Sequence, residues 1–288
     1  MSQQLDRPDG RTLAWCEQGD PDGQPVLYCH GFPSCGREAR FADTAARAAG
    51  VRLIAPDRPG MGDSTPQPGR RIRDWPAEAR ALQAHLGAAT MPVLGLSGGA
   101  PYALACTAMA PERFGPIACL GGLGPLEDPE HALGMSAVSR LSIRLARRRS
   151  PLQAAMFHTL GAVIRRQPKI LFALLAGTAP PADRAVFRDR ELRGTWQAAM
   201  RHAMANGAGG AIDELRLYVQ PWDVPLERID ASVTLWHGDQ DSVVPGHHAE
   251  RLHALLPTST LQRCSNEGHF SLPIRHIETA LSCLRAQG

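Results

Sequence analysis

A serine set among glycines offers the clearest chemistry in the sequence. Residues 95–99 read Gly-Leu-Ser-Gly-Gly, within and after the apolar run Pro92–Leu96 and before a helical pattern over Ala100–Ala110. A tight turn from a strand into a helix, which only small neighbours tolerate, would hold the Ser97 hydroxyl at the edge of a sheet beside the start of the helix. The alternative is a glycine-rich turn with an incidental serine. The flanking strand and helix favour Ser97 as a nucleophile.

A serine hydroxyl is a weak nucleophile at neutral pH and requires a neighbouring base. His269 lies in the segment Asn266–Phe270, after the last predicted strand and before the last predicted helix. A loop at that position can bring an imidazole over the edge of the sheet. His253 and His276 are the alternatives, but the first is expected on a helix surface and the second inside the final helix. We predict His269 as the base.

The acid that orients such a histidine is expected after the penultimate strand. The segment 237–245, His-Gly-Asp-Gln-Asp-Ser-Val-Val-Pro, offers two aspartates. Asp241 lies deeper in the loop and precedes an apolar anchor, whereas Asp239 follows a glycine and is expected to stabilise the turn. Glu127 and Asp128, after the fourth predicted strand, are further alternatives. We predict Asp241 as the acid.

Acyl transfer also requires hydrogen-bond donors for a developing oxyanion. The segment His30–Pro33, His-Gly-Phe-Pro, follows the first buried strand and can present the backbone amide of Phe32. The amide of Gly98, directly after the serine, would be the second donor. An ordinary turn at the end of a strand is the alternative for residues 30–33. The Phe32 side chain would also form part of a pocket wall.

The sequence predicts no cofactor and no metal ion. A Gly-x-Gly-x-x-Gly pattern after a strand, typical of dinucleotide sites, is missing. His247, His248 and Glu250 are better explained as the solvated start of a helix than as metal ligands. The seven cysteines contain no Cys-x-x-Cys pair, so the sequence suggests neither a zinc ribbon nor a thioredoxin-like site.

Four short apolar runs in the first half, which alternate with helical patterns, and two further strand segments near the end of the chain predict the elements that position these residues. Runs that are apolar throughout are typical of parallel strands covered on both faces. The predicted fold class is therefore α/β, with a mostly parallel central sheet flanked by helices. The expected strands cover residues 26–30, 51–56, 92–96, 116–120, 233–236 and 260–264, and the expected helices cover 38–49, 76–86, 100–110, 246–256 and 273–285.

A long helical segment interrupts this alternation. We predict an α/β core of residues 1–124 and 226–288, with a helical lid inserted over 125–225. Its arginine run 147–149 is expected to be a solvated face; contact with an anionic substrate or a membrane surface is the alternative. Six lid residues could line a pocket, although core packing is the simpler expectation for each: Met135, Met156, Phe157, Phe172, Trp196 and Met200.

The bulk properties limit the partners. A net charge of +3 over 288 residues is too small to indicate a nucleic-acid partner. The uncharged stretch 86–111 is long enough to cross a bilayer, but its prolines and glycines favour a buried strand, turn and helix, so no integral membrane segment is expected. A polar start and unpaired cysteines predict a cytoplasmic protein. The sequence leaves the oligomeric state open.

Taken together, these motifs resemble the lidded α/β-hydrolase superfamily over nearly the full chain. The resemblance implies the fold, a Ser-His-Asp triad and a helical lid after the strand that ends near Gly122. Haloalkane dehalogenases and epoxide hydrolases of this superfamily use an aspartate where this chain has Ser97, and proline iminopeptidases usually carry a tryptophan near the serine that is missing here. The matching segments are His30–Pro33, Asp57–Ser64, Gly95–Gly99, His237–Pro245 and Asn266–Phe270.

The expected function is therefore that of a serine hydrolase that cleaves a carboxylic ester or a related acyl compound through an acyl-enzyme. Its partner would be a small-molecule acyl substrate. A carbon–carbon bond hydrolase or a thioesterase of the same fold is the alternative enzyme. A non-enzymatic ligand sensor that retains the triad is an alternative of another class, because folds and even catalytic sites can serve binding alone.

Overall fold

Eight strands form one central sheet in the computed structural model, which describes residues 2–287. The strand order is β1-β2-β4-β3-β5-β6-β7-β8. The pairs β1–β2 and β2–β4 are antiparallel and all the others are parallel, so the predicted fold class is confirmed. The strands are β1 Gln3–Asp6, β2 Thr12–Gly19, β3 Gln24–Cys29, β4 Val51–Pro56, β5 Met91–Leu96, β6 Phe114–Leu120, β7 Val233–Gly238 and β8 Ser259–Cys264.

Each of the six predicted strands lies within two residues of an observed one, but β1 and β2 were not predicted. The four residues of β1 are mostly exposed, and β2 includes the polar residues Glu17 and Gln18. Antiparallel strands near a sheet edge expose part of their surface to water, so they lack the continuous apolar run that marks a buried parallel strand.

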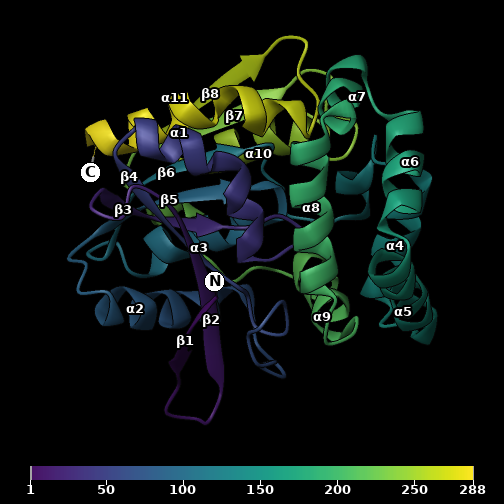
Figure 1. Cartoon of the computed structure of the whole chain (residues 1–288), viewed down its shortest axis with the longest axis horizontal. Helices are drawn as coiled ribbons and strands as arrows, with labels where there is room; N and C mark the ends of the chain where they lie inside the picture. The colour runs from purple at the N-terminus through teal and green to yellow at the C-terminus, as the bar shows by residue number, and fades with distance from the viewer. Residues whose placement is uncertain (1, 288) are drawn as a thin grey trace.

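Helices cover both faces of the sheet (Figure 1). Residues of α2 and α3 pack in one apolar cluster, and those of α1 and α11 pack in a second cluster on the other side. The predicted helix over 38–49 is divided into a 3-10 helix, Gly36–Ala42, and the short α1. The covering helices are α1 Asp43–Ala48, α2 Trp75–His85, α3 Ala100–Met109, α10 His247–Leu255 and α11 Ser271–Gln287.

Six further helices follow one another between β6 and β7 and stand together at one side of the sheet (Figure 1). We call α4–α9 the insertion helices. The division of the chain into a core and a lid over 125–225 remains a prediction. The insertion helices are α4 Ala137–Arg147, α5 Pro151–Arg166, α6 Pro168–Thr178, α7 Pro181–Arg188, α8 Arg190–Ala203 and α9 Gly209–Tyr218.

The parallel strands all end at the same edge of the sheet, where the loops that follow them meet. The loops after β3, β5, β7 and β8 carry the residues for which the sequence predicts chemistry. In the part of the chain that the structure describes, no helix is both long and apolar enough to span a membrane. The uncharged stretch 86–111 contains β5 and α3, as expected for a buried strand followed by a helix.

Candidate active site

Ser97 lies at the sharp turn between β5 and α3. Its φ of 52° falls in the left-handed region, which a residue with a side chain seldom adopts. Close packing explains the glycines around it. A Cβ atom on Gly99 would lie 2.0 Å from the carbonyl oxygen of Cys29, and one on Gly95 would lie 2.9 Å from Cα of Ala100. Glycine is therefore required on both sides of the strained serine.

The three residues predicted as nucleophile, base and acid form a continuous hydrogen-bonded chain. Nε2 of His269 lies 2.9 Å from Oγ of Ser97, and its Nδ1 lies 2.7 Å from Oδ2 of Asp241. All three residues are buried, each with 7–8% of its surface exposed. The structure thus brings residues from the loops after three different strands within hydrogen-bonding distance, with Ser97 and His269 close enough for proton transfer from the hydroxyl to the imidazole.

Asp241 is held in place by the loop that carries it. Its Oδ1 accepts hydrogen bonds from the amides of Val243 at 2.9 Å and Val244 at 2.8 Å, which leaves Oδ2 for the imidazole. Gly121 lies next to the His269–Asp241 pair and has a φ of 56°. A Cβ atom at this position would lie 3.3 Å from Nδ1 of His269. Glycine at 121 therefore leaves room for the histidine–aspartate pair.

The alternative residues make other contacts. Asp239 accepts a hydrogen bond from the Asn266 amide at 2.8 Å, so it joins the loops after β7 and β8. His253 pairs with the Ser259 hydroxyl at 2.8 Å, and Asp128 caps the start of a short 3-10 helix. The remaining two are Glu127, which is exposed, and His276, which lies 4.0 Å from Glu267.

The electrostatic surroundings favour a basic His269. Burial alone would lower the pKa of its imidazole, because burial disfavours the charged form. The Asp241 carboxylate opposes burial through its charge and its hydrogen bond, Asp183 and Glu38 add further negative charge, and the pKa of His269 is raised. A histidine whose pKa lies at or above its usual value of about 6.5 is a competent proton acceptor near neutral pH.

The Phe32 amide, one predicted oxyanion donor, is oriented by contacts to the preceding carbonyl. Arg58 donates through Nη2 to the carbonyl oxygen of Gly31 at 2.9 Å and through Nη1 to that of His30. Because the C=O and N–H of a trans peptide point in opposite directions, holding the Gly31 oxygen directs the Phe32 N–H away from Arg58. Within residues 2–287 no acceptor is hydrogen-bonded to this amide.

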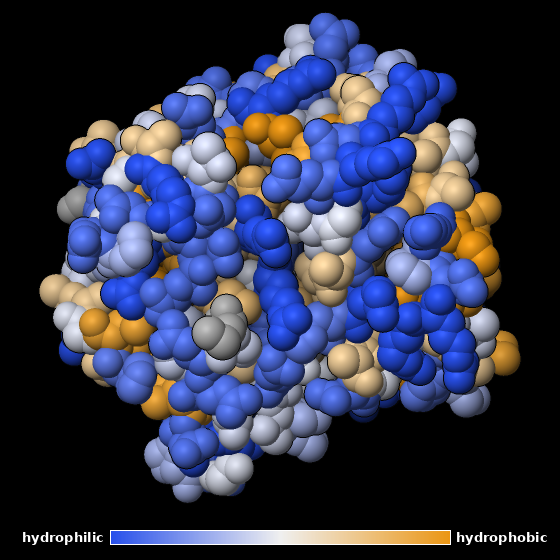
Figure 2. Space-filling model, viewed as in Figure 1, coloured by the Kyte–Doolittle hydropathy of each residue, from blue (hydrophilic) through white to orange (hydrophobic). Residues whose placement is uncertain are grey.

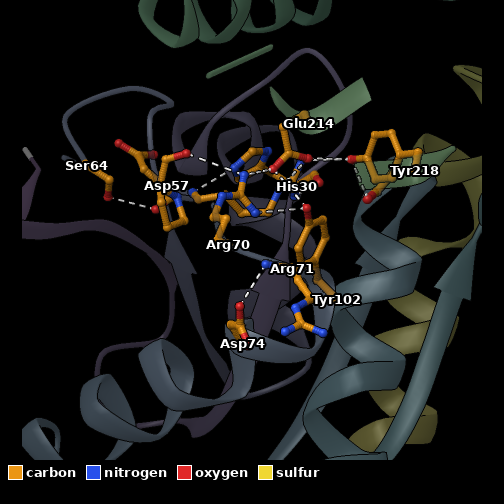
Figure 3. A network of polar contacts seen from close by, with 12 residues as sticks. His30, Asp57, Ser64, Arg70, Arg71, Asp74, Tyr102, Glu214 and Tyr218 are labelled. Atoms are coloured by element: carbon orange, nitrogen blue, oxygen red, sulfur yellow. Dashed lines mark hydrogen bonds and ion pairs between the residues drawn. The ribbon is translucent and has the colours of Figure 1, made fainter. Parts of the chain in front are cut away.

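Arg58 is itself held by Glu214, a residue of the insertion helix α9. Both side chains are fully buried, with Nε of Arg58 3.1 Å from Oε2 of Glu214, and Arg70 binds the other carboxylate oxygen. Tyr102 donates to Glu214 at 3.0 Å. Burial alone would raise the pKa of Glu214, but the two arginines lower it to about 2. Figure 3 shows Arg70, Tyr102, Glu214 and Tyr218 directed towards one another.

Tyr218, one helical turn after Glu214, extends this network to the other predicted oxyanion donor. Its hydroxyl lies 2.7 Å from Oε2 of Glu214 and 2.8 Å from the carbonyl oxygen of Gly98. Its ring packs edge-on against Phe32, with the ring centres 5.5 Å apart. Helix α9 therefore contacts both backbone segments whose amides were predicted to bind an oxyanion.

A second insertion-helix carboxylate holds the loop that carries His269. Asp183 in α7 is buried, and its oxygens accept the backbone amides of His269 at 3.0 Å, Phe270 at 2.9 Å and Ser271 at 2.8 Å. Gly268 makes this approach possible, because a Cβ atom there would lie 2.5 Å from the carboxylate. Negative charge also complements the start of α11, which begins at Ser271.

Sequence reasoning did not identify these supporting residues. Arg58 lies in the segment 57–64 that carries part of the family resemblance, but its role depends on an acid that no motif marks. Glu214 and Asp183 lie in helices of the insertion. The spacing of Glu214 and Tyr218 by four residues places them on one helix face, which was the only signal available.

A cavity of about 210 Å³ adjoins Ser97. Within residues 2–287 none of its lining side chains is charged, and most are apolar. Of the six insertion residues expected as candidates, Met135 and Phe157 line it. Phe172 and Trp196 belong to a separate cluster, and Met156 and Met200 pack against the core. The lining residues are Phe32, Pro33, Ser97, Gly98, Leu123, Leu126, Met135, Ser139, Ser142, Ile143, Phe157, Leu215, Tyr218, Val243 and Val244.

One group among the described residues has the composition of a metal site. Ligand atoms of Asp57, Asp63 and His202 lie within 4.8 Å of one another. Both Asp57 oxygens already accept backbone amides, at 2.6 Å from Gly36 and 2.9 Å from Asp63. Nε2 of His202 is 2.9 Å from the Asp63 carboxylate. These contacts join the loop after β4 to helix α8 and account for the group without an ion.

The residues 247, 248 and 250, considered as metal ligands in the sequence, also have other partners. The Gly124 amide donates to Nδ1 of His248 at 3.2 Å, and Nε2 of His247 lies 3.0 Å from the carbonyl oxygen of His131. Glu250 pairs with an arginine of β8.

A serine at a strand-to-helix turn, joined to histidine and aspartate at the carboxyl edge of a parallel sheet, is the arrangement of an α/β hydrolase. A family model described as the alpha/beta hydrolase fold matches residues 24–274. The chain belongs to this family, and it is a hydrolase of the α/β fold. The resemblance inferred from the sequence is thus confirmed.

Curated relatives differ in the reactions their names describe. A proline iminopeptidase of Arabidopsis thaliana is 32% identical over 111 residues, which cover 36% of this chain and 28% of the relative. An epoxide hydrolase of Caballeronia sordidicola is 32% identical over 109 residues, or 37% of this chain and 32% of that protein. The matches thus span about a third of these relatives, whose activities do not transfer to this chain.

Solved structures match over nearly the whole chain. A thermophilic esterase from Thermogutta terrifontis superposes with a TM-score of 0.68 at 19% identity, covering 99% of this chain and 97% of that one. A hydrolase from Pseudomonas aeruginosa gives a TM-score of 0.72 at 17% identity, with 98% and 97% covered. At such identities the likeness shows the fold alone.

Glu214→Gln should destabilise the protein by about 3–5 kcal/mol, because it leaves two buried arginines without their counter-charge. The neighbouring Asp213→Asn is the matched control, since that carboxylate is 57% exposed and 4.0 Å from its nearest cation. Its expected effect on the free energy of unfolding is below about 1 kcal/mol. Urea unfolding of the native protein and the two variants measures both changes in stability. Equal stability of the two variants would contradict the role of Glu214.

Asp183→Asn should lower the pKa of His269, because it removes a negative charge that stabilises the imidazolium. The pKa is measured by NMR titration of histidine ring signals, with the His269 signal assigned by its loss in His269→Gln. Asp213→Asn again serves as the control and should leave the titration unchanged. An unchanged His269 titration in a folded Asp183→Asn protein would show that Asp183 acts on backbone structure alone.

Proposed function

We propose that the protein is a serine hydrolase that cleaves carboxylic esters whose acyl groups are small and uncharged. The observation that carries the proposal is the hydrogen-bonded chain from Ser97 through His269 to Asp241, which borders an uncharged cavity. We propose further that the insertion helices act as its lid.

The predicted cytoplasmic location is supported by seven free cysteines.

In the proposed reaction, His269 takes the proton of Ser97 as the hydroxyl oxygen attacks the ester carbonyl. The amides of Phe32 and Gly98 donate to the oxyanion of the tetrahedral intermediate. Asp241 stabilises the imidazolium and keeps the ring in the required orientation. His269 then protonates the leaving alcohol, and water cleaves the acyl-enzyme by the same steps with the base acting on water.

The cavity favours esters over the substrates named for the curated relatives. A peptide with a free N-terminus brings an ammonium group, and the lining residues offer it no carboxylate. Glu214 is already paired with two arginines. Opening an epoxide by attack of Ser97 would leave an ether, which water does not cleave under the conditions that cleave an ester. Thioesters share the carbonyl chemistry of esters and remain the alternative substrate within this proposal.

The proposal predicts turnover of p-nitrophenyl acetate and butyrate, with little release of p-nitroaniline from proline p-nitroanilide. Ser97→Ala should lower kcat/KM for the esters by about 10³-fold or more, because it removes the nucleophile. Ser265→Ala, a serine-to-alanine change at an exposed position of the loop before His269, is the control and should retain native activity.

Other outcomes would identify other functions. Release of no more than one equivalent of p-nitrophenol per protein chain would indicate that the protein is a ligand sensor that retains the triad and not an enzyme. Ester turnover that is equal in the Ser97→Ala and native proteins would show that another group is the nucleophile. Either result contradicts the proposal.

A further inference from the structure

The segment 137–178, which forms helices α4, α5 and α6, carries charge of one sign only. It contains eight arginine and lysine residues and not a single aspartate or glutamate, whereas the whole chain has 31 basic and 28 acidic residues. We call it the basic segment. Among the ion pairs of the described residues, none involves a side chain of this segment.

The same helices expose large aliphatic side chains. Val138, Leu152 and Leu174 have 69%, 65% and 67% of their surface exposed, and Ile170 and Leu141 have 52% and 47%. Figure 2 shows hydrophobic and strongly hydrophilic residues side by side at the right-hand edge, where Figure 1 places α4 and α6. Exposed aliphatic groups interspersed with unpaired cations are typical of a surface that lies at the boundary of a lipid bilayer.

Helix α4 connects this surface with the cavity. Val138, Leu141 and Arg144 follow at intervals of three residues and are all exposed. On the opposite side of the helix, Ser142 and Ile143 are buried and line the cavity beside Ser97. One helix therefore separates the exposed basic and aliphatic surface from the candidate active site.

We propose that the basic segment docks the protein on the surface of an anionic lipid bilayer. Arginine and lysine side chains are attracted to anionic headgroups, and the exposed aliphatic side chains enter the region between headgroups and acyl chains. A second copy of the chain would bring the same positive surface into contact and be repelled. Nucleic acid would neutralise the cations but leave the five aliphatic side chains without an apolar partner.

Docking also specifies the substrate class, a step that rests on the proposed function. Lipophilic esters partition into bilayers and reach a high concentration there. An enzyme whose uncharged cavity lies behind a membrane-bound helix is therefore close to such esters. The docking itself does not require catalysis, and the Ser97→Ala protein should bind vesicles as well as the native protein does. Failure of docking is therefore distinguishable from failure of the ester-hydrolase proposal.

Vesicle flotation tests the docking directly. The native protein should bind vesicles of phosphatidylcholine with roughly one-third phosphatidylglycerol at least tenfold more tightly than vesicles of phosphatidylcholine alone, and added salt should weaken the binding. Equal binding to both vesicles, or to neither, would overturn the proposal. Tighter binding to a DNA duplex than to the anionic vesicles would overturn it in favour of nucleic acid.

Two charge-reversal variants of equal net charge test whether vesicle binding depends on where the cations lie or only on the net charge of the protein. The variant Arg140→Glu/Arg144→Glu/Lys169→Glu changes three exposed cations of the basic segment. The control, which has the same net charge, changes three exposed arginines elsewhere: Arg73→Glu/Arg80→Glu/Arg228→Glu. The first should bind anionic vesicles at least tenfold more weakly than the control does. Equal affinities of the two variants would overturn the proposal.

An apolar pair tests the aliphatic contribution without a change of charge. Leu141→Ser/Leu174→Ser should weaken vesicle binding severalfold, because it removes two exposed apolar groups from the docking surface. Leu255→Ser, at a leucine that is 42% exposed in α10, is the control and should bind as the native protein does. Unchanged binding of the first variant would overturn the insertion of Leu141 and Leu174 into the lipid.

Discussion

The buried charge of Glu214 is the constraint on which the arrangement of the site depends. A carboxylate that is removed from water is tolerated only with full compensation, and here Arg58, Arg70 and two tyrosine hydroxyls surround it. Because Arg58 also binds the carbonyl oxygens of the loop after β3, the ion pair sets the direction of the Phe32 amide. The network thus links the packing of helix α9 with the geometry of a candidate oxyanion site.

The insertion helices therefore do more than cover a cavity. Helix α9 orients the backbone near the predicted oxyanion donors, and α7 places the Asp183 carboxylate on three amides at the loop of His269. The loops at the edge of the sheet supply Ser97, His269 and Asp241, and the insertion supplies groups that hold the backbone around them. A displacement of either helix would disturb the site without changing any of the three residues that form the hydrogen-bonded chain.

Much of the fold could be predicted because buried parallel strands have a local signature, and the apolar runs of β3–β7 show it. The strands β1 and β2 could not, since Glu17 and Gln18 interrupt the pattern at a partly exposed edge. Ser97 follows directly after β5, and Asp241 and His269 lie in the loops after β7 and β8, so the common edge of a parallel sheet brings them together. Glu214 and Asp183 lie in an insertion whose packing no local pattern encodes, and their roles required the three-dimensional arrangement.

We propose that the insertion helices hold Ser97 in an activated state. The rate at which a fluorophosphonate probe labels the protein, with the labelled residue mapped by mass spectrometry, measures this activation. We expect a single adduct on Ser97, and labelling at least tenfold slower in a folded Glu214→Gln protein, because the backbone amides predicted as oxyanion donors lose their support. Labelling of another residue, or an equal rate in the folded variant, would show that the insertion helices do not activate Ser97.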